Sequence, residues 1–313
     1  MTAYVVRRFL ATIPVLLIVA LVVFGLIHFS PGDPAAILAG QEATKAEIDA
    51  IREGLGLNRP LPVQLGIYFK DLLTGDLGRS IISRHKVATL IRQRAVPTIS
   101  LALLTEIVAI GLAVPLGVIA AWKANSWIDR AVMVFASFSF SIPVFWLGFL
   151  LIYLFGVKLD WFPVAGYVAP TDGFGAYLHR LVLPSIATGL IVMALIARMT
   201  RATVLEVLRE DYIRTAWAKG MASKTVLMRH ALRNAALPIV TVIGIGLAGL
   251  LGGLVVTEQV FAIPGLGRLL VNAILARDYP IIQGTILVIS VVYVFVNLLV
   301  DISYAFFDPR IKY

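Results

Sequence analysis

The apolar residues of this chain fall into six long blocks that are separated by polar or turn-rich segments. The blocks cover residues 9–29, 96–121, 131–155, 181–197, 235–257 and 281–306. An α-helix needs about 20 predominantly apolar residues to cross the hydrocarbon core of a bilayer. A helix satisfies its own backbone hydrogen bonds in lipid, and the blocks lack the two-residue alternation of a membrane barrel. The pattern therefore predicts an all-α integral membrane protein with six transmembrane helices.

The composition agrees with this fold class. Hydrophobic residues make up 59% of the chain and charged residues 14%, whereas ordinary globular domains carry about 25% charged residues. The first block follows Arg7 and Arg8, but it is longer than the core of a secretory signal and has no small-residue cleavage site after His28. We therefore expect it to be retained as a helix. The absence of cysteine excludes disulfides and thiolate sites.

The basic residues are divided unequally between the two sides that six spans define. With a cytoplasmic N-terminus, the inner side receives Arg7, Arg8, Lys123, Arg130, Arg198, Arg201, Arg209, Arg214, Lys219, Lys224, Arg229, Arg233, Arg310 and Lys312. Because Lys and Arg accumulate in cytoplasmic loops, this asymmetry predicts two cytoplasmic termini and explains the net charge of +9 without a nucleic-acid partner. Arg84, Lys86, Arg92 and Arg94 oppose it, but long outer segments translocate largely regardless of charge.

Residues 30–95 form that outer segment, and their pattern predicts a small folded insertion between the first two spans. Thr44 as an N-cap, with Glu47 three residues later, predicts a short amphipathic helix over 44–55. A second helix is expected over 65–73. A segment of this size is too small for a large independent core. We therefore expect it to cap the outer mouth of the membrane domain and to offer a landing site to a soluble partner.

Turn-forming motifs punctuate the insertion and support this division of the chain. They are Pro31-Gly32-Asp33-Pro34, Arg59-Pro60-Leu61-Pro62 and Gly75-Asp76-Leu77-Gly78. The predicted organisation is an N-terminal segment with the first helix at 1–29, the insertion at 30–95, and a five-helix core at 96–313 with a cytoplasmic loop at 198–235.

No motif in the chain indicates catalysis. A glycine-rich phosphate loop ending in lysine, a His-Glu-x-x-His zinc pair and a Gly-x-Ser-x-Gly elbow are all missing. The histidines are isolated in sequence, which favours interfacial solvation over a shared metal site; they are His28, His85, His179 and His230. We expect no enzymatic activity and no metal or cofactor bound by this chain.

Acidic residues in or at the edges of the apolar blocks are candidates for a substrate path. Charged groups within a bilayer usually face a bundle interior or a water-filled cavity. Glu106 in the second block and Glu258 at the outer end of the fifth can therefore line such a path, or they can form hydrogen bonds between helices. For Asp301, close to the inner end of the sixth block, the pattern favours a structural role.

Glycine and proline positions in the membrane blocks predict local geometry. Gly249 and Gly253 lie four residues apart, so a helix would place them on one face that another helix can approach closely, or that takes part in gating. Pro143 removes a backbone hydrogen bond and is expected to bend the third helix. Neither feature alone separates a transporter from an inert bundle.

The polar loop at 198–235 is too long and too well patterned to be a simple connection. A helix is expected over 204–214, with a second one starting at Glu210 and Asp211 and ending at Gly220. Small or apolar residues, namely Ile213, Ala216, Trp217 and Gly220, fall on one side of this helix and leave Arg214, Lys219 and Lys224 for solvent or a partner. This face favours docking into a groove of another protein; the alternative is a basic helix lying on anionic lipid.

The same loop carries a resemblance to a known family. Arg214-Thr215-Ala216-x-x-x-Gly220 resembles the Glu-Ala-Ala-x-x-x-Gly loop of permease subunits of bacterial ABC importers. Arg214 and Thr215 depart from the general motif, and Leu237-Pro238 comes later than the general pattern has it, as is typical of the dipeptide/oligopeptide/nickel branch.

The resemblance to that branch extends along nearly the whole chain. Besides the turn motifs at 31–34 and 75–78, it includes Leu55-Gly56-Leu57 with Pro60 and Gln64, Arg229-His230-Ala231-Leu232-Arg233-Asn234, Glu258-x-Val260-Phe261-x-x-Pro264-Gly265-Leu266-Gly267, Arg277-Asp278-Tyr279-Pro280 and Asp308-Pro309-Arg310. Their order and spacing together identify the chain as a member of the branch.

The resemblance implies a function and a set of partners. It implies a permease subunit of the bacterial inner membrane that imports short peptides. Its partners would be a second homologous permease, two ATPase subunits and a periplasmic or lipid-anchored binding protein. ATP and Mg²⁺ would bind on the ATPases. The loop would couple the permease to them through Asp211, Arg214, Thr215, Ala216, Lys219 and Gly220, and the substrate path would include Glu106, Glu258, Gly249 and Gly253.

Other functions stay open at this point. An importer of the same type could carry nickel chelates, glutathione or another small solute. A stand-alone secondary transporter could use Glu106 to carry protons, although the internal repeats common in such proteins are not evident. A membrane-anchored assembly factor without transport activity is the third alternative.

Overall fold

The computed structural model describes residues 2–29, 33–40, 43–54 and 56–307, and nearly all of them are helical. Within these ranges, the only extended pairing is an isolated bridge between Arg79 and Lys86. This confirms the all-α class. The expected turn at Pro31 and Gly32, and the motif Asp308-Pro309-Arg310, lie outside the described residues.

The chain forms two compact units. The first unit comprises Met1–Arg8, Val96–Arg268 and Phe295–Tyr313, and the second comprises Phe9–Ala95 and Leu269–Val294. Four helices have residues in both units, namely α1 (Thr2–Phe29), α5 (Val87–Trp122), α13 (Leu266–Ala276) and α14 (Tyr279–Phe307). The three-part division expected from the sequence stays a prediction.

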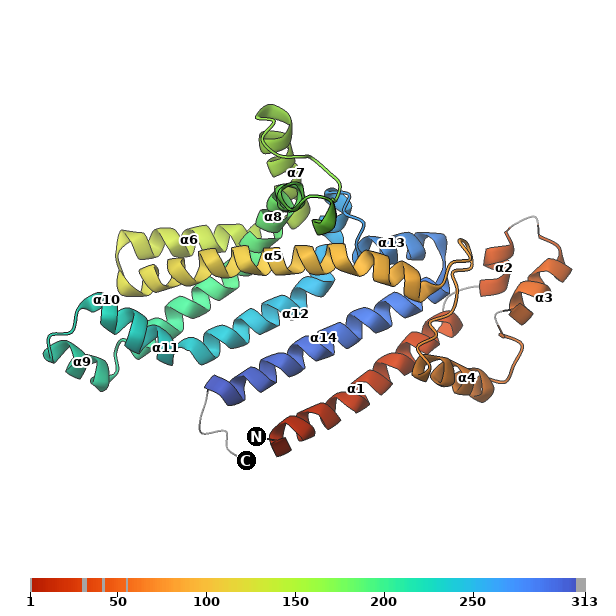
Figure 1. Cartoon of the computed structure of the whole chain (residues 1–313), viewed down its shortest axis with the longest axis horizontal. Helices are drawn as coiled ribbons and strands as arrows, with labels where there is room; N and C mark the ends of the chain where they lie inside the picture. The colour runs from red at the N-terminus through yellow and green to blue at the C-terminus, as the bar shows by residue number, and fades with distance from the viewer. Residues whose placement is uncertain (1, 30–32, 41–42, 55, 308–313) are drawn as a thin grey trace. The chain divides into compact units, whose positions relative to one another are not determined.

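The remaining helices belong to one unit each. The first unit contains α6 (Trp127–Ser141), α7 (Val144–Leu151), η1 (Ile152–Lys158), η2 (Pro170–Asp172), α8 (Phe174–Val207), α9 (Asp211–Ala218), α10 (Ser223–Thr225), η3 (Val226–Ala231), α11 (Leu232–Asn234) and α12 (Ala236–Val260). The second contains α2 (Pro34–Ala39), α3 (Lys45–Gly54) and α4 (Leu61–Leu73). The short helices α9, α10 and α11 lie together beyond the C-terminal end of α8 (Figure 1).

Four helices are long and apolar enough to cross a membrane. They include Val6–Phe29 of α1, Tyr279–Ser303 of α14, and the whole of α5 and α8. Two further candidates are bent pairs, Trp127–Ser141 with Val144–Lys158 and Ser223–Asn234 with Ala236–Leu250. The described residues therefore hold four to six spans, and the expected six are reached only when each bent pair counts as one.

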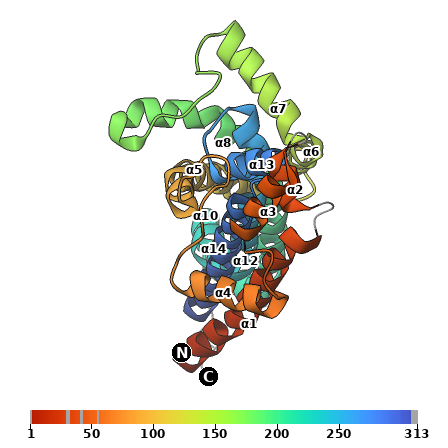
Figure 2. The ribbon, with the colours of Figure 1, turned by 90° about the vertical axis from the view of Figure 1, so that its right-hand side faces the viewer.

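The bend in the third block is sharper than a simple kink. Helix α6 ends at Ser141, α7 begins at Val144, and the two segments differ in direction by 101°. Ile142 is extended, as residues before proline tend to be, and Pro143 accepts the hydrogen bond from Leu147 N–H that starts α7. Figure 2 shows α7 turning steeply away from the end of α6. The predicted effect of Pro143 is thus confirmed, as a break between two helices.

Helix α8 is the centre of the first unit. It packs against α6, α7 and α12, and 61% of its most apolar 18-residue stretch is buried. Its contact with α5 is close, because a Cβ on Gly117 would lie 2.6 Å from the Cβ of Thr200. The most apolar 18-residue stretches of α1 and α14 are only 17% buried, so most of their apolar surface is not covered by the part of the chain that the structure describes.

The predicted N-capping motif of the insertion is confirmed in the second unit. The Thr44 backbone N–H donates to Glu47 Oε2 at 2.8 Å, and the Glu47 N–H donates to Thr44 Oγ1 at 3.4 Å. These reciprocal bonds satisfy two free donors at the start of α3. The hydrogen bonds from the backbone and the hydroxyl of Thr44 also lower the pKa of Glu47.

The second helix of the insertion is longer than expected. Helix α4 begins at Leu61, four residues before the predicted start, because Pro62 stands in its first turn, where a missing N–H is tolerated. Together with α1 and α14 it encloses a small apolar core around Val23, Leu72 and Leu287. Burial raises the pKa of Tyr68, which packs at the edge of this core, to about 12.

Candidate functional site

The polar segment at 198–235 begins with the end of α8 and the short helix α9, which are joined by a tight turn. Helix α8 ends at Val207, and Glu210 is extended (φ −67°, ψ 146°) before α9 starts at Asp211. The predicted second start is confirmed, but the predicted continuous helix over 204–214 is wrong. The reason is the turn at 208–210, in which Glu210 N–H bonds to the carbonyl of Val207 and redirects the chain.

Gly220 ends α9 as predicted. Its φ of +76° lies in the left-handed region that glycine adopts without strain. The Gly220 N–H donates to the carbonyl of Trp217 at 2.9 Å, and the Met221 N–H donates to that of Ala216 at 3.3 Å. These two bonds form a Schellman motif, which fixes the direction in which the chain leaves the helix.

The face of α9 that was expected to dock on a partner is largely occupied by the chain itself. Ile213 is 1% exposed and Ala216 is 7% exposed, and both pack with Val226 of η3. Val207 and Leu208 at the end of α8, together with Met221, complete this cluster. The expected orientation is therefore corrected: the small-residue face anchors α9 to its own subunit.

The rest of α9 is exposed. Trp217 is 53% exposed and Tyr212 is 43% exposed. Arg214 Nη1 lies 3.2 Å from Asp211 Oδ1, an open ion pair of little energetic weight. Thr215 and Lys219 are also exposed, and the Thr215 hydroxyl donates to the carbonyl of Asp211. The structure thus keeps these predicted residues on one accessible helix but separates them from Ala216.

A side-chain bond that sequence reasoning missed ties α9 to the next membrane helix. Asn234 Nδ2 donates to the Tyr212 hydroxyl at 2.8 Å and to the carbonyl of His230 at 2.9 Å. Asn234 ends α11 just before α12. Asn234 lies within a motif that the resemblance singled out, whereas Tyr212 lies two residues before the other motif, so only the position of Asn234 was an available signal.

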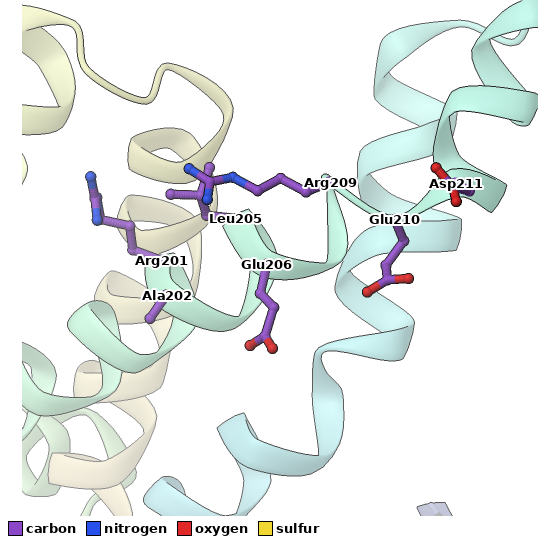
Figure 3. A pocket seen from close by; sticks show the side chains of 7 residues that line it. All are labelled: Arg201, Ala202, Leu205, Glu206, Arg209, Glu210 and Asp211. Atoms are coloured by element: carbon purple, nitrogen blue, oxygen red, sulfur yellow. The ribbon is translucent and has the colours of Figure 1, made fainter.

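A surface cavity of about 490 Å³ lies in the elbow between α8 and α9 (Figure 3). It is lined by Arg201, Ala202, Leu205, Glu206, Arg209, Glu210 and Asp211. Glu206 and Glu210 point the same way, whereas Asp211 points away from them. Arg201, on its wall, forms a bidentate ion pair with Asp129 of α6. No sequence pattern indicates this pair, because its members lie 72 residues apart.

Glu106 is buried near the middle of α5. It is 6% exposed, and neither carboxylate oxygen has a hydrogen-bond partner among the described residues. A Cβ on Gly246 of α12 would lie 3.9 Å from its Oε1, so the side chain reaches toward that helix. The carboxyl group is therefore enclosed by packed helices without a donor in the part of the chain that the structure describes.

Glu258, at the end of α12, is also buried but is fully bonded. It is 0% exposed; Oε1 accepts from the Thr98 hydroxyl at 2.6 Å, and Oε2 accepts from the Arg268 N–H at 2.9 Å. A Cβ on Gly265 would lie 2.0 Å from Oε1, so only glycine fits there. Glu258 thus closes the turn between α12 and α13.

Gly249 and Gly253 lie on an open face of α12. Both are exposed, and a Cβ on either would meet no atom of the described structure within 4 Å. The close approach within this chain occurs instead at Gly244, where a Cβ would lie 2.1 Å from Val300 of α14. The glycine pair therefore leaves an accessible surface on α12.

Family models match almost the whole chain. Residues 113–313 match a model described as "Binding-protein-dependent transport system inner membrane component". Residues 1–102 match one described as "Binding-prot-dependent transport system membrane comp, N-term". The two matches leave only ten residues of the chain uncovered.

Individual relatives agree with these matches. A "probable peptide ABC transporter permease protein" of Sinorhizobium fredii is 47% identical over 313 residues, with both chains covered in full. A "glutathione transport system permease protein" of Pectobacterium atrosepticum is 44% identical, again over the whole of both chains. A chain from an inward-facing structure of the MetNI methionine ABC transporter has the same fold, with a TM-score of 0.58 and 19% identity; the match covers 70% of this chain and 96% of that one.

Proposed function

The chain belongs to the family of inner membrane components of binding-protein-dependent transport systems, and we propose that it imports short peptides. As a family member it is an integral inner membrane protein and a permease subunit of an ABC transporter. The full-length similarity to permeases named for peptides and for glutathione, itself a small peptide, supports the substrate class. Nickel chelates and other small solutes are the alternative cargo.

The proposed topology has six spans and both termini in the cytoplasm. The two bent helix pairs each serve as one span in it. Residues 30–95 then lie on the outer side, where a periplasmic or lipid-anchored binding protein would deliver substrate. The excess of Lys and Arg in the inner loops supports this orientation.

The observation that carries the coupling role is the construction of α9. Its buried residues fix it to the end of α8, and Gly220 fixes its end, while Tyr212, Arg214 and Trp217 stay exposed. A short helix that is anchored by two buried residues and exposes aromatic and charged side chains suits a cleft in a second protein. In the proposed mechanism that protein is one of two ATPase subunits, which bind ATP and Mg²⁺ and hydrolyse the ATP.

The other predicted residues take distinct places in this mechanism. Asp211, Arg214, Thr215 and Lys219 contact the ATPase, whereas Ala216 and Gly220 hold the helix in place. This chain supplies half of the substrate path with a second, homologous permease, which meets the open surface at Gly249 and Gly253. Glu106 is a candidate residue of the substrate path, and Glu258 holds the helices that form this path in place. ATP binding closes the ATPases and biases the spans toward one of two arrangements.

Replacing Trp217 by alanine tests the coupling role. In the complex reconstituted with its ATPases, we expect Trp217→Ala to weaken retention of the ATPase subunits by roughly tenfold or more, since exposed aromatic anchors carry much of an interface. The measurement is co-purification of the ATPases from detergent and uptake of a labelled dipeptide. The matched control is Trp161→Ala, because Trp161 has a similar exposed fraction, 58%, but lies outside the cytoplasmic segment.

The same reconstitution separates the rival functions. Equal ATPase retention and uptake by Trp217→Ala and the wild type would contradict a docking role for α9. Dipeptide uptake by the permeases alone, driven by a proton gradient and lost in Glu106→Gln, would support a secondary transporter. The buried, unbonded carboxyl of Glu106 is the observation that keeps this second candidate open.

A further inference from the structure

The ion pair between Asp129 and Arg201 joins two membrane helices beside the cytoplasmic segment. Asp129 Oδ1 lies 2.5 Å from Arg201 Nε, and Oδ2 lies 2.6 Å from Arg201 Nη2. Two parallel bonds between a guanidinium and a carboxylate fix both distance and orientation, which a lysine could not do. The pair therefore sets the position of α6 on α8.

The carboxylate end of the pair is rigid. Asp129 is 3% exposed, and its Oδ2 also accepts the backbone N–H of Asn125 at 2.9 Å. Asn125 has a φ of +65°, and the Ser126 hydroxyl accepts the N–H of Asp129 at 3.4 Å. The Asp129 side chain thus bonds both to the turn between α5 and α6 and, through Arg201, to α8. A displacement of Asp129 therefore moves this turn and the start of α6 together.

The guanidinium end of the pair is connected to α9. Arg201 stands on α8 six residues before Val207, about 9 Å along an unbroken helix. Val207 and Leu208 pack against Ile213 and Ala216, so α9 cannot shift without displacing the end of α8. Arg201 also lines the cavity in the elbow between the two helices (Figure 3).

We propose that Asp129 and Arg201 are positioning residues that make α6 follow α8 when the ATPases move α9. This inference rests on the proposed coupling role of α9. The motion would pass from α9 to the end of α8, through the ion pair to the start of α6, and along α6 to the break at Pro143. Packing between α6 and α8 also couples the two helices, so loss of the ion pair weakens the coupling between their motions rather than abolishing it.

Spin labels on the two helices test the proposal without knowledge of the substrate. The natural chain contains no cysteine, so Val134→Cys on α6 and Ala218→Cys on α9 each give one nitroxide site, and both positions are exposed. In the full complex, Mg²⁺–ATP with vanadate should change the spectrum at both sites. In Asp129→Asn we expect the change at position 134 to fall about fivefold or more, with the change at position 218 retained.

Three further variants separate positioning from mere stability. Arg130→Gln removes a positive charge beside Asp129, in the first turn of α6, but keeps both hydrogen bonds of the ion pair, so it should leave both signals intact. Arg201→Lys keeps the charge but loses the two-pronged contact, so the signal at position 134 should fall partway. Asp129→Asn with Arg201→Gln leaves no lone buried charge, so the fold should be kept while the signal at position 134 stays low.

The outcomes test the positioning role of the ion pair separately from the coupling role of α9, on which it rests. A wild-type response at position 134 in the double variant would overturn the positioning role and leave only a structural one. If Asp129→Asn alone fails to assemble, the double variant and Arg201→Lys still decide. Absence of a nucleotide response at position 218 in the otherwise unchanged chain would instead refute the coupling role of α9.

Discussion

Glu106 and Glu258 are both glutamates on membrane helices of the first unit, both are buried, and their surroundings are opposite. Glu258 accepts hydrogen bonds from Thr98 and Arg268, whereas Glu106 has no partner among the described residues. A buried acid with all its donors in place stabilises a fold, and one without them points to another conformation or another molecule. The difference assigns Glu258 to support of the fold and agrees with the proposed place of Glu106 on the substrate path.

Glu258 is part of a short relay that holds the turn after α12. The Leu266 N–H donates to Thr98 Oγ1 at 2.8 Å, and the Thr98 hydroxyl donates onward to Glu258 Oε1. The turn itself includes Ala262 at a φ of +52°, which is strained for a residue with a side chain. The relay links the start of the membrane part of α5 to the end of α12 through atoms that water does not reach.

The largest effect is expected for Glu258→Ala. It leaves the Thr98 hydroxyl and the Arg268 N–H without their acceptor and opens a cavity, so we expect the free energy of unfolding to fall by roughly 3–5 kcal/mol. Thermal unfolding of the detergent-solubilised complex measures the loss. Glu258→Gln, which keeps the shape and one acceptor, is the matched control and should lose less. Equal stability of wild type and Glu258→Ala would contradict the relay.

A smaller effect is expected for Thr98→Val, which has almost the same shape as threonine. It removes one donor and one acceptor and leaves the Leu266 N–H unpaired, at a cost of about 1–3 kcal/mol. Thr98→Ser keeps the hydroxyl and should lie closer to the wild type. Hydrogen exchange at the Leu266 amide gives a second measurement, and unchanged protection there in the valine variant would be inconsistent with the bond.

The smallest effect on stability is expected for Glu106→Gln. No hydrogen bond is lost, so the change in unfolding free energy should stay within about 0.5 kcal/mol, or favour the variant, because a neutral amide is easier to bury than a carboxylate. The same thermal assay measures it. A loss comparable to that of Glu258→Ala would reveal a bonded partner for Glu106 and remove the contrast between the two residues.

The polar segment at 198–235 shows how far sequence reasoning reached. The start of α9 at Asp211 and its end at Gly220 were predicted correctly, since capping and left-handed turns depend on a few neighbouring residues. The burial of Ile213 and Ala216 against Val226 was not predicted, because an amphipathic pattern indicates only that one face of a helix is covered and not by which residues. The identity of the cover is a property of the folded chain.

The sequence by itself determined the elements whose causes are local. The apolar blocks predicted membrane helices, Thr44 and Glu47 predicted the start of α3, and Pro143 predicted the break after α6. Each of these rests on hydrophobic length, backbone sterics or hydrogen bonds within four residues of the position concerned.

Only the tertiary structure decided which polar side chains are satisfied and which faces stay open. Asp129 meets Arg201 across 72 residues, and Thr98 meets Glu258 across 160. Glu106 meets no donor in the described part of the chain, although the residues next to it in sequence are as apolar as those next to Glu258. Such pairings depend on how helices pack in space, and the spacing of residues along one helix carries no record of the residues on its neighbour.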